Sequence, residues 1–184
     1  MTYKTLNEYK EETHPWQPFI PTNADKLILG TFPTAEINRG AYEFFYPNPN
    51  NDFWRVLFQA AEKKLEDYKQ VEPIEIRKQI LAELKLGIGD IGKKILRQKD
   101  SSKDDNLFPI EYTDIFLILE NYPSIKKIII TSSSGSNSVL SWFHHYCILN
   151  GHNFIIPKEK LPIKTKLIFK SREINIEIIS SPSR

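Results

Sequence analysis

Cysteine is almost missing from this sequence, since Cys147 is the only one in 184 residues. A single thiol cannot form a disulfide within the chain, so a disulfide-stabilised secreted fold is excluded and a reducing cytoplasm is expected. No apolar run reaches the roughly 18 residues that a membrane-spanning helix needs. The first residues are polar and include acids, unlike a signal peptide. We therefore expect a cytoplasmic protein without a membrane partner.

An excess of one charge is missing too, because 25 Lys and Arg residues face 23 Asp and Glu residues and leave a net charge of +2. This balance excludes a polycationic tail. It does not exclude a local basic patch, because phosphate binding depends on where the charges lie. Such a patch is either a solvated face or a contact for a phosphate backbone. The basic residues that gather before the last predicted strand are Lys158, Lys160, Lys164, Lys166, Lys170 and Arg172.

Residues that bind metals are few. The one grouping is His144, His145, Cys147 and His152. On a helix Cys147 lies on a different face from His145, and no pair of cysteines completes a tetrahedral site. A Gly-x-Ser-x-Gly turn and a Ser/His/Asp set are also missing, which argues against a serine hydrolase. We expect no metal in this protein.

Three of the seven glycines, Gly87, Gly89 and Gly92, spell the G-x-G-x-x-G pattern of dinucleotide-binding folds. That pattern has its meaning only after a strand and before a helix. Here the preceding residues continue a helical pattern, and no acidic residue ends a second strand at the expected distance. We therefore expect no cofactor, and predict that the glycines let a strand pass close to its neighbours, with Asp90 at its end.

The length and the 40% hydrophobic content predict one domain over residues 1–184, with residues 1–23 as a lead-in that includes a short helix. Short apolar strands alternate with segments of helical period, which predicts an α/β fold with a mainly parallel sheet. The polar run 97–106 is predicted to be an exposed loop. Predicted strands lie in 26–30, 125–133, 166–170 and 174–180, and predicted helices in 50–68, 72–85, 113–123 and 136–151.

Small polar residues follow the predicted strands, in segments 30–34, 132–137 and 180–184. In α/β folds, ligands bind at the carboxyl ends of the strands, so these segments are predicted to converge on one crevice. Segment 132–137 resembles a phosphate cradle but lacks the G-K-[ST] ending of a P-loop. It either binds an anion with backbone N–H groups or is an ordinary helix cap formed by Ser136 or Asn137.

Residues 45–57, FYPNPNNDFWRVL, combine two prolines, three asparagines and several aromatic residues before a helical run. The segment is either a plain surface turn, with Asn50, Asn51 or Asp52 as a helix cap, or a loop that holds a base or a sugar.

Three motifs together resemble the uracil-DNA glycosylase superfamily, and within it the mismatch-specific and hypoxanthine branches. Gly30-Thr31-Phe32-Pro33 is similar to the family's Gly-x-x-Pro loop after the first strand. The stretch from Asn48 to Trp54 is similar to the family's His-Pro-x-Asn-x-Phe-Trp segment, except at its first position. Ser181-Pro182-Ser183 is similar to its late Ser-Pro-Ser loop. The resemblance spans residues 26–184.

This resemblance implies a three-layer α/β/α sandwich around a central four-stranded, mainly parallel sheet. It also implies a monomeric, metal-free DNA glycosylase that excises uracil or hypoxanthine from DNA by hydrolysing the N-glycosidic bond. Such an enzyme takes the damaged base out of the stack and holds it in a pocket.

The resemblance assigns expected roles residue by residue. Asn51 is the expected catalytic residue, which orients water or bonds the base edge. DNA phosphates are expected at Ser183, Ser134 and Ser136. The base pocket is expected to be formed by Gly30, Thr31, Phe32, Pro33, Phe45, Tyr46, Asn48 and Ser181.

Three departures from the family pattern leave alternatives open. Phe32 stands where many relatives carry a catalytic Asp or Asn, and Asn48 replaces the family histidine. Relatives continue past the position of Arg184 into a loop that wedges into DNA, so either the chain is cut short here or the wedge is absent. The alternatives to an active enzyme are a catalytically silent nucleic-acid or nucleobase binder of the same fold, or an unrelated protein that binds a small phosphorylated ligand through segment 132–137.

Overall fold

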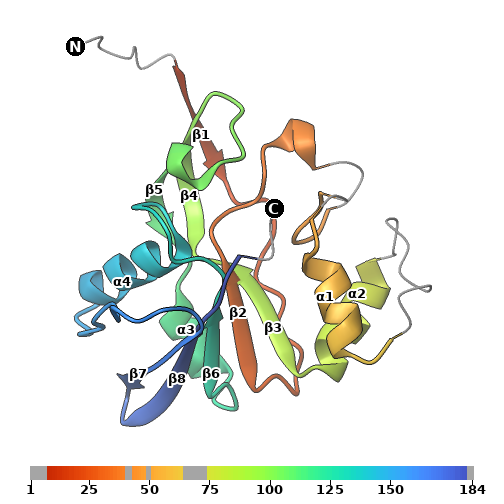
Figure 1. The fold of residues 1–184 in the computed structure, drawn as a ribbon, viewed down its shortest axis with the longest axis vertical. Helices are drawn as coiled ribbons and strands as arrows, with labels where there is room; N and C mark the ends of the chain where they lie inside the picture. Colours follow the sequence, from red (N-terminus) through yellow and green to blue (C-terminus); the bar gives the residue numbers. More distant parts are fainter. Residues whose placement is uncertain (1–7, 40–42, 49–50, 64–73, 182–184) are drawn as a thin grey trace.

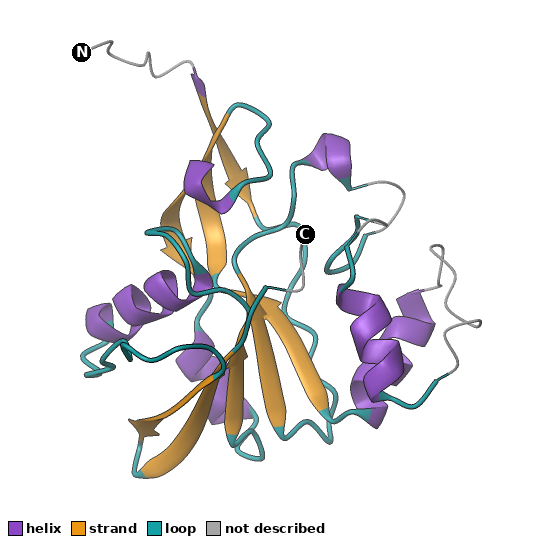
Figure 2. Cartoon of the chain, in the orientation of Figure 1, coloured by secondary structure: helices purple, strands orange, loops and turns teal. Residues whose placement is uncertain are grey.

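A computed structural model describes residues 8–39, 43–48, 51–63 and 74–181 (Figure 1). Strands and helices follow one another along most of this part of the chain, as Figure 2 shows. The strands are β1 (Tyr9–Thr13), β2 (Lys26–Gly30), β3 (Leu86–Asp90), β4 (Gly92–Gln98), β5 (Leu107–Tyr112), β6 (Lys127–Ile130), β7 (Ile163–Phe169) and β8 (Arg172–Ile178). The helices are α1 (Phe53–Ala60), α2 (Ile74–Glu83), α3 (Ile115–Asn121) and α4 (Val139–Leu149), with short 3₁₀ turns η2 (Glu36–Asn38) and η4 (Asp104–Asn106).

The central sheet has the strand order β3-β2-β6-β8-β7. β2 pairs in parallel with both β3 and β6, and β6 pairs in parallel with β8. The α/β class is therefore confirmed. The predicted four-stranded sheet is not, because β7 pairs antiparallel with β8 and makes the sheet five-stranded and mixed. Lys170 and Ser171 both have positive φ, which suits the tight turn that joins β7 to β8.

Helices cover both faces of the central sheet, with α1 and α2 on one side and α3 and α4 on the other (Figure 1). Side chains alternate between the faces along each strand, so neighbouring residues enter different cores. Leu27 and Leu29 of β2 pack into the core that includes α3 and α4, whereas Ile28 packs into the core that includes α1 and α2. The continuous apolar runs of these strands are thus explained by burial on both faces.

A second, three-stranded antiparallel sheet, β1-β4-β5, lies beyond the carboxyl ends of the central strands (Figure 2). It corrects two predictions. Tyr9–Thr13 in the lead-in is a strand and not a short helix, and the polar run 97–106 is not simply an exposed loop, because Arg97 is fully buried at its start. The sequence did not reveal this sheet, because Arg97 occupies a core position and pairs there with Glu12 of β1. A charged residue at a core position breaks the apolar pattern of a buried strand.

All four predicted helices are present in the described residues, but not all of their ends are as expected. Asp114 caps α3 by accepting a hydrogen bond from the backbone N–H of Leu117. α4 is capped by Ser138, and not by Ser136 or Asn137 as predicted. α1 ends at Ala60, and the later part of its predicted range lies partly outside the described residues. None of the helices in the described part of the chain is long and apolar enough to cross a membrane.

The three glycines at 87, 89 and 92 do lie where the chain passes close to its neighbours. A methyl group on Gly87 would approach the side chain of Ile20, and one on Gly89 would touch Pro18. Gly92 is the most restricted, because a Cβ there would lie 2.9 Å from Cζ3 of Trp142 and 3.0 Å from the backbone oxygen of Thr31.

Gly92→Ala is expected to lower the free energy of unfolding by about 1–3 kcal/mol, because a buried indole and a backbone carbonyl must move to admit the methyl group. Urea denaturation measures this. Lys93→Ala, on the exposed neighbouring position, is the matched control and should stay within about 0.5 kcal/mol of the parent protein. Equal stability of Gly92→Ala and Lys93→Ala would contradict the packing described here.

Candidate functional site

A pocket of about 530 Å³ opens at the carboxyl ends of the parallel strands. Because β2, β3, β6 and β8 run in the same direction, the segments that follow them meet at one edge of the sheet. The pocket is lined by Gly30, Thr31, Phe32, Pro33, Thr34, Tyr46, Pro47, Asn48, Asn51, Asp90, Ser102, Lys103, Asp104, Asp105, Thr131, Ser132, Ser134 and Ser181.

Each of the three polar segments predicted to converge contributes to this lining. Segment 30–34 lines it throughout, segment 132–137 contributes Ser132 and Ser134, and segment 180–184 contributes Ser181. The prediction of a shared crevice is therefore confirmed for the described residues. Ser183 lies outside the described residues, and Ser136 is exposed but not part of the lining.

Arg97 of β4 holds segment 30–34 in place. Its guanidinium donates a hydrogen bond of 2.7 Å to the backbone oxygen of Pro33 and another to the oxygen of Ser101. Arg97 also pairs with Glu12 and lies over the ring of Phe32. Since Arg97 has no exposed surface, these contacts are desolvated, and a change in the arginine would alter the pocket wall.

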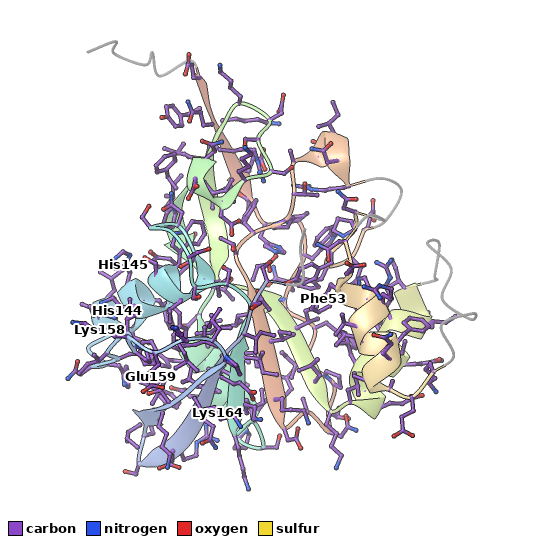
Figure 3. All side chains as sticks on the ribbon, viewed as in Figure 1. Phe53, His144, His145, Lys158, Glu159 and Lys164 are labelled. Atoms are coloured by element: carbon purple, nitrogen blue, oxygen red, sulfur yellow. The ribbon has the colours of Figure 1, made fainter. Side chains whose placement is uncertain are left out.

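The aromatic pair Phe45 and Tyr46 divides between core and pocket. Phe45 is 1% exposed, accepts the Trp54 indole N–H at its backbone oxygen, and does not line the pocket. Tyr46 lines it, and its ring stacks on Phe53 at 3.8 Å between centroids and 8° between planes. Phe53, at the start of α1, is labelled in Figure 3. Tyr46 has φ 51°, a left-handed backbone that turns its side chain out of the preceding apolar run.

Asn51 and Asn48 both line the pocket. The side-chain oxygen of Asn51 accepts a hydrogen bond of 2.8 Å from the backbone N–H of Phe53, which fixes the asparagine at the start of α1. The turn interpretation and the site interpretation of this segment therefore both hold in part, because Asn51 supports the helix start and lines the pocket.

Several polar side chains in segment 132–137 and directly after it form hydrogen bonds within the surrounding structure. Ser132 accepts from the N–H of Val139, and Ser138 from that of Ser141. Asn137 contacts the backbone oxygen of Asp105 and the Trp142 indole. These bonds favour the capping interpretation of the segment over a phosphate cradle.

The histidine group and the basic run lie elsewhere. Figure 3 shows His144, His145 and Lys158 on the α4 side of the sheet, away from Phe53. His144 bonds the backbone oxygen of Phe154. No group of three or more His, Cys, Asp or Glu side chains within the described ranges could hold a metal ion. Lys166 and Lys170 pair with Glu173 and Glu120, as expected of a solvated face.

Two carboxylates in the pocket, the buried Asp90 and the partly buried Asp104, were missed as site residues. Asp90, 7% exposed, ends β3, and its Oδ2 lies 2.9 Å from Nε2 of His14. Asp104 accepts a hydrogen bond of 3.0 Å from the Thr31 hydroxyl. Asp90 was visible in the sequence as the polar end of an apolar strand, whereas Asp104 stood in a polar run without any pattern.

Burial shapes the protonation of the pocket. It raises the pKa of Asp104 from 3.8 to about 6; the Thr31 hydrogen bond opposes this and the nearby Asp90 adds to it. Burial also raises the pKa of Tyr46, reinforced by Asp90, so its phenol keeps its proton at any ordinary pH. The pocket therefore offers a hydroxyl donor and a carboxyl group that titrates near neutrality.

Comparisons with known proteins fit this geometry. A curated hypoxanthine DNA glycosylase from Methanosarcina acetivorans is 29% identical over 109 residues, which are 59% of this chain and 64% of that protein. Another, from Methanosarcina barkeri, is 24% identical over 112 residues, 61% of this chain and 66% of its own length. The resemblance to the uracil-DNA glycosylase superfamily is confirmed.

A solved structure has a similar fold. The solution structure of a candidate uracil DNA glycosylase from Methanosarcina acetivorans matches with a TM-score of 0.59 and 20% identity, over 93% of this chain and 84% of that one. No family model matches the sequence. The chain spans a little less than two thirds of the length of the curated glycosylases it matches.

Asp104→Asn is expected to stabilise the protein at pH 7.5 by about 1–3 kcal/mol and to have almost no effect at pH 4. The pKa of Asp104 is higher in the folded protein than the ordinary 3.8, so the folded state holds more protons between pH 4 and pH 6. Stability is therefore lost as the pH rises through this window, and the neutral amide avoids the loss. Thermal unfolding from pH 4 to pH 8 measures the difference; the exposed Asp100→Asn is the control, and parallel curves for Asp104→Asn and the parent would refute the assignment.

Proposed function

We propose that this protein is a DNA glycosylase that removes a deaminated base, uracil or hypoxanthine, by hydrolysing its N-glycosidic bond in base excision repair. The observation that carries the proposal is the single pocket to which the three family-like motifs contribute Phe32, Asn51 and Ser181. The protein would act on damaged DNA as a cytoplasmic monomer without metal or cofactor. Two relatives that carry the name hypoxanthine DNA glycosylase support this substrate class.

The size and lining of the pocket suit one base that has left the stack. Its volume of about 530 Å³ is in the range of small-molecule sites. Phe32, Pro33 and Pro47 supply an apolar wall against which a base ring can pack. Amide, hydroxyl and carboxyl groups on the other walls can bond the edge of a base, which is how flipped bases are held.

Hydrolysis requires a positioned water and a stabilised leaving base. The C1′–N bond breaks with its electron pair going to the base, the water oxygen adds to C1′, and the proton that this water loses passes to the solvent. Asn51 would orient this water, because the bond from Phe53 N–H fixes its side chain at the pocket wall. Backbone N–H groups of segment 30–34 would face the charge that develops on the base. Asp104, whose pKa is about 6, would give the departing base a proton.

Contacts to DNA would lie at the mouth of the pocket. Ser134 and Ser181 are exposed there, and Lys103 belongs to the same lining. We assign Ser134, together with Ser136 and Ser183, to DNA phosphates. Affinity for DNA should then fall with added salt, because phosphate contacts release counterions.

The alternative is a silent protein of the same fold that binds a nucleobase or nucleic acid without cleaving it. Its supporting observation is Phe32, which is buried and packs against His14, and which cannot orient water. Binding of a deoxyinosine oligonucleotide without release of the base would favour this alternative.

Purified protein is expected to release hypoxanthine or uracil from oligonucleotides that carry deoxyinosine or deoxyuridine, leaving abasic sites that alkali cleaves. Single-turnover rates should fall by about 10²-fold or more in Asn51→Ala, as when one positioned polar group is removed from an active site. An undamaged duplex of the same sequence is the substrate control.

Asn51→Ser separates catalysis from support of the helix start, because a serine hydroxyl can also accept the backbone N–H two residues on but is too short to serve the pocket. It should melt like the parent protein and be as slow as Asn51→Ala. The exposed Asn23→Ala is the matched asparagine control and should keep the parental rate. Full activity in Asn51→Ser would reduce Asn51 to a residue that supports the start of α1, and no base release by the parent protein would end the glycosylase proposal.

A further inference from the structure

Deamination changes one edge of a base in a defined way. The ring nitrogen that carried a lone pair gains a hydrogen, and the neighbouring amino group becomes a carbonyl. Hypoxanthine and uracil therefore present an N–H donor beside a C=O acceptor, whereas adenine and cytosine present the opposite pair. A pocket that selects deaminated bases needs an acceptor beside a donor, because a mismatched pair leaves buried polar groups unbonded.

Asp90 is an acceptor placed in the pocket. It is the strand partner of Gly30, and each of these residues ends its strand. Gly30 has no side chain at the place where Asp90 Oδ1 lies, and a Cβ there would clash with that oxygen. The carboxylate is 8% exposed at its side chain, and yet it lines the pocket.

His14 fixes the orientation and the role of this carboxylate. Its Nδ1 accepts the backbone N–H of Trp16 at 3.0 Å, so in the neutral ring the proton lies on Nε2 and is donated to Asp90 Oδ2. The ring is packed between Phe32 and Phe45, at centroid distances of 5.3 and 5.6 Å. One oxygen of Asp90 is thereby occupied, and Oδ1 is the oxygen beside Gly30.

Tyr46 supplies the donor on the same spot. Its hydroxyl would lie 2.9 Å from a Cβ built on Gly30, the same position that Asp90 Oδ1 crowds. The two oxygens therefore both lie close to one point beside Gly30. The stacking of Tyr46 on Phe53 holds the ring in place, and burial, with the Asp90 carboxylate, raises the pKa of the phenol and keeps it protonated.

We propose that Asp90 and Tyr46 read the deaminated edge: Asp90 Oδ1 accepts the ring N–H of the base, and the Tyr46 hydroxyl donates to its carbonyl, with His14 as the residue that positions Asp90. The inference rests on the proposed binding of a damaged base in this pocket. It assigns these residues to the choice of base, and it leaves the bond-breaking step to Asn51, Asp104 and water.

Such a pair rejects adenine for a physical reason. The lone pair on its ring nitrogen would face the carboxylate, and burial would leave both without a hydrogen bond. A hydrogen bond to a charged group is worth about 1.5–3 kcal/mol, which corresponds to a preference of about 10- to 100-fold. The tyrosine bond, between neutral groups, is expected to account for about 5-fold.

Binding without cleavage is the direct test. Oligonucleotides with a single 2′-fluoro-2′-deoxyinosine or 2′-fluoro-2′-deoxyadenosine resist base release, and fluorescence anisotropy gives the affinity of the protein for each. The parent protein should prefer the inosine strand by about 10- to 100-fold. Asp90→Asn should lose most of this preference, because an amide can turn to offer either a donor or an acceptor. Tyr46→Phe should lower it about 5-fold.

Three further variants sharpen the test. His14→Gln keeps a donor for Asp90 and should keep most of the preference, whereas His14→Phe should lose it. Glu111→Gln, an exposed carboxylate on β5, should leave it unchanged. An unchanged preference in both Asp90→Asn and Tyr46→Phe would overturn the assignment, as would equal binding of the two strands by the parent protein. A parent protein that prefers inosine but releases no base supports the assignment and sinks only the glycosylase proposal.

Discussion

The parallel pairing of β2 between β3 and β6 is the constraint on which the rest of the structure depends. It aligns Gly30 with Asp90 and brings the ends of the strands to one edge of the sheet. The loops that follow these strands meet at that edge, because the chain leaves each strand in the same direction. A ligand site at this edge follows from strand direction before any side chain is considered.

The second sheet supports the site through a buried, hydrogen-bonded ion pair in place of apolar packing. Arg97 of β4 is fully buried and joins Pro33 to Glu12 of β1. Burying a charge is costly unless it is paired and hydrogen-bonded. The loss of either contact of Arg97 would therefore destabilise the other. The lead-in at residues 9–14 thereby supports the pocket from outside its lining, since Glu12 pairs with Arg97 and His14 bonds Asp90.

Phe32 has a packing role in the pocket wall. It stands where many relatives carry a polar catalytic residue, and its ring packs on His14 and under Arg97. Polar groups reach the pocket from other places instead, among them Asp90, Asp104, and Tyr46 and Asn51 of segment 45–57. The pocket holds two carboxyl groups in different environments: Asp104 has a pKa near 6, and Asp90 is hydrogen-bonded to His14. Such a difference in environment assigns different tasks to similar groups.

The sequence by itself determined the α/β class, the strand at β6, the capped helix α3 and the convergence of the three polar segments, because burial on both faces and capping leave local patterns that one segment carries alone. It also indicated Asn51 and the strand end at Asp90. Only the tertiary structure decided that β1 is a strand, that β7 adds a fifth strand, that Phe45 belongs to the core, that His14 bonds Asp90, and that Asp104 lines the pocket. The reason is that these features depend on partners far away in the chain: His14 lies 76 residues from Asp90, and Thr31 lies 73 residues from Asp104. No local period records such a pairing, and a polar residue reads as exposed until its distant partner is known.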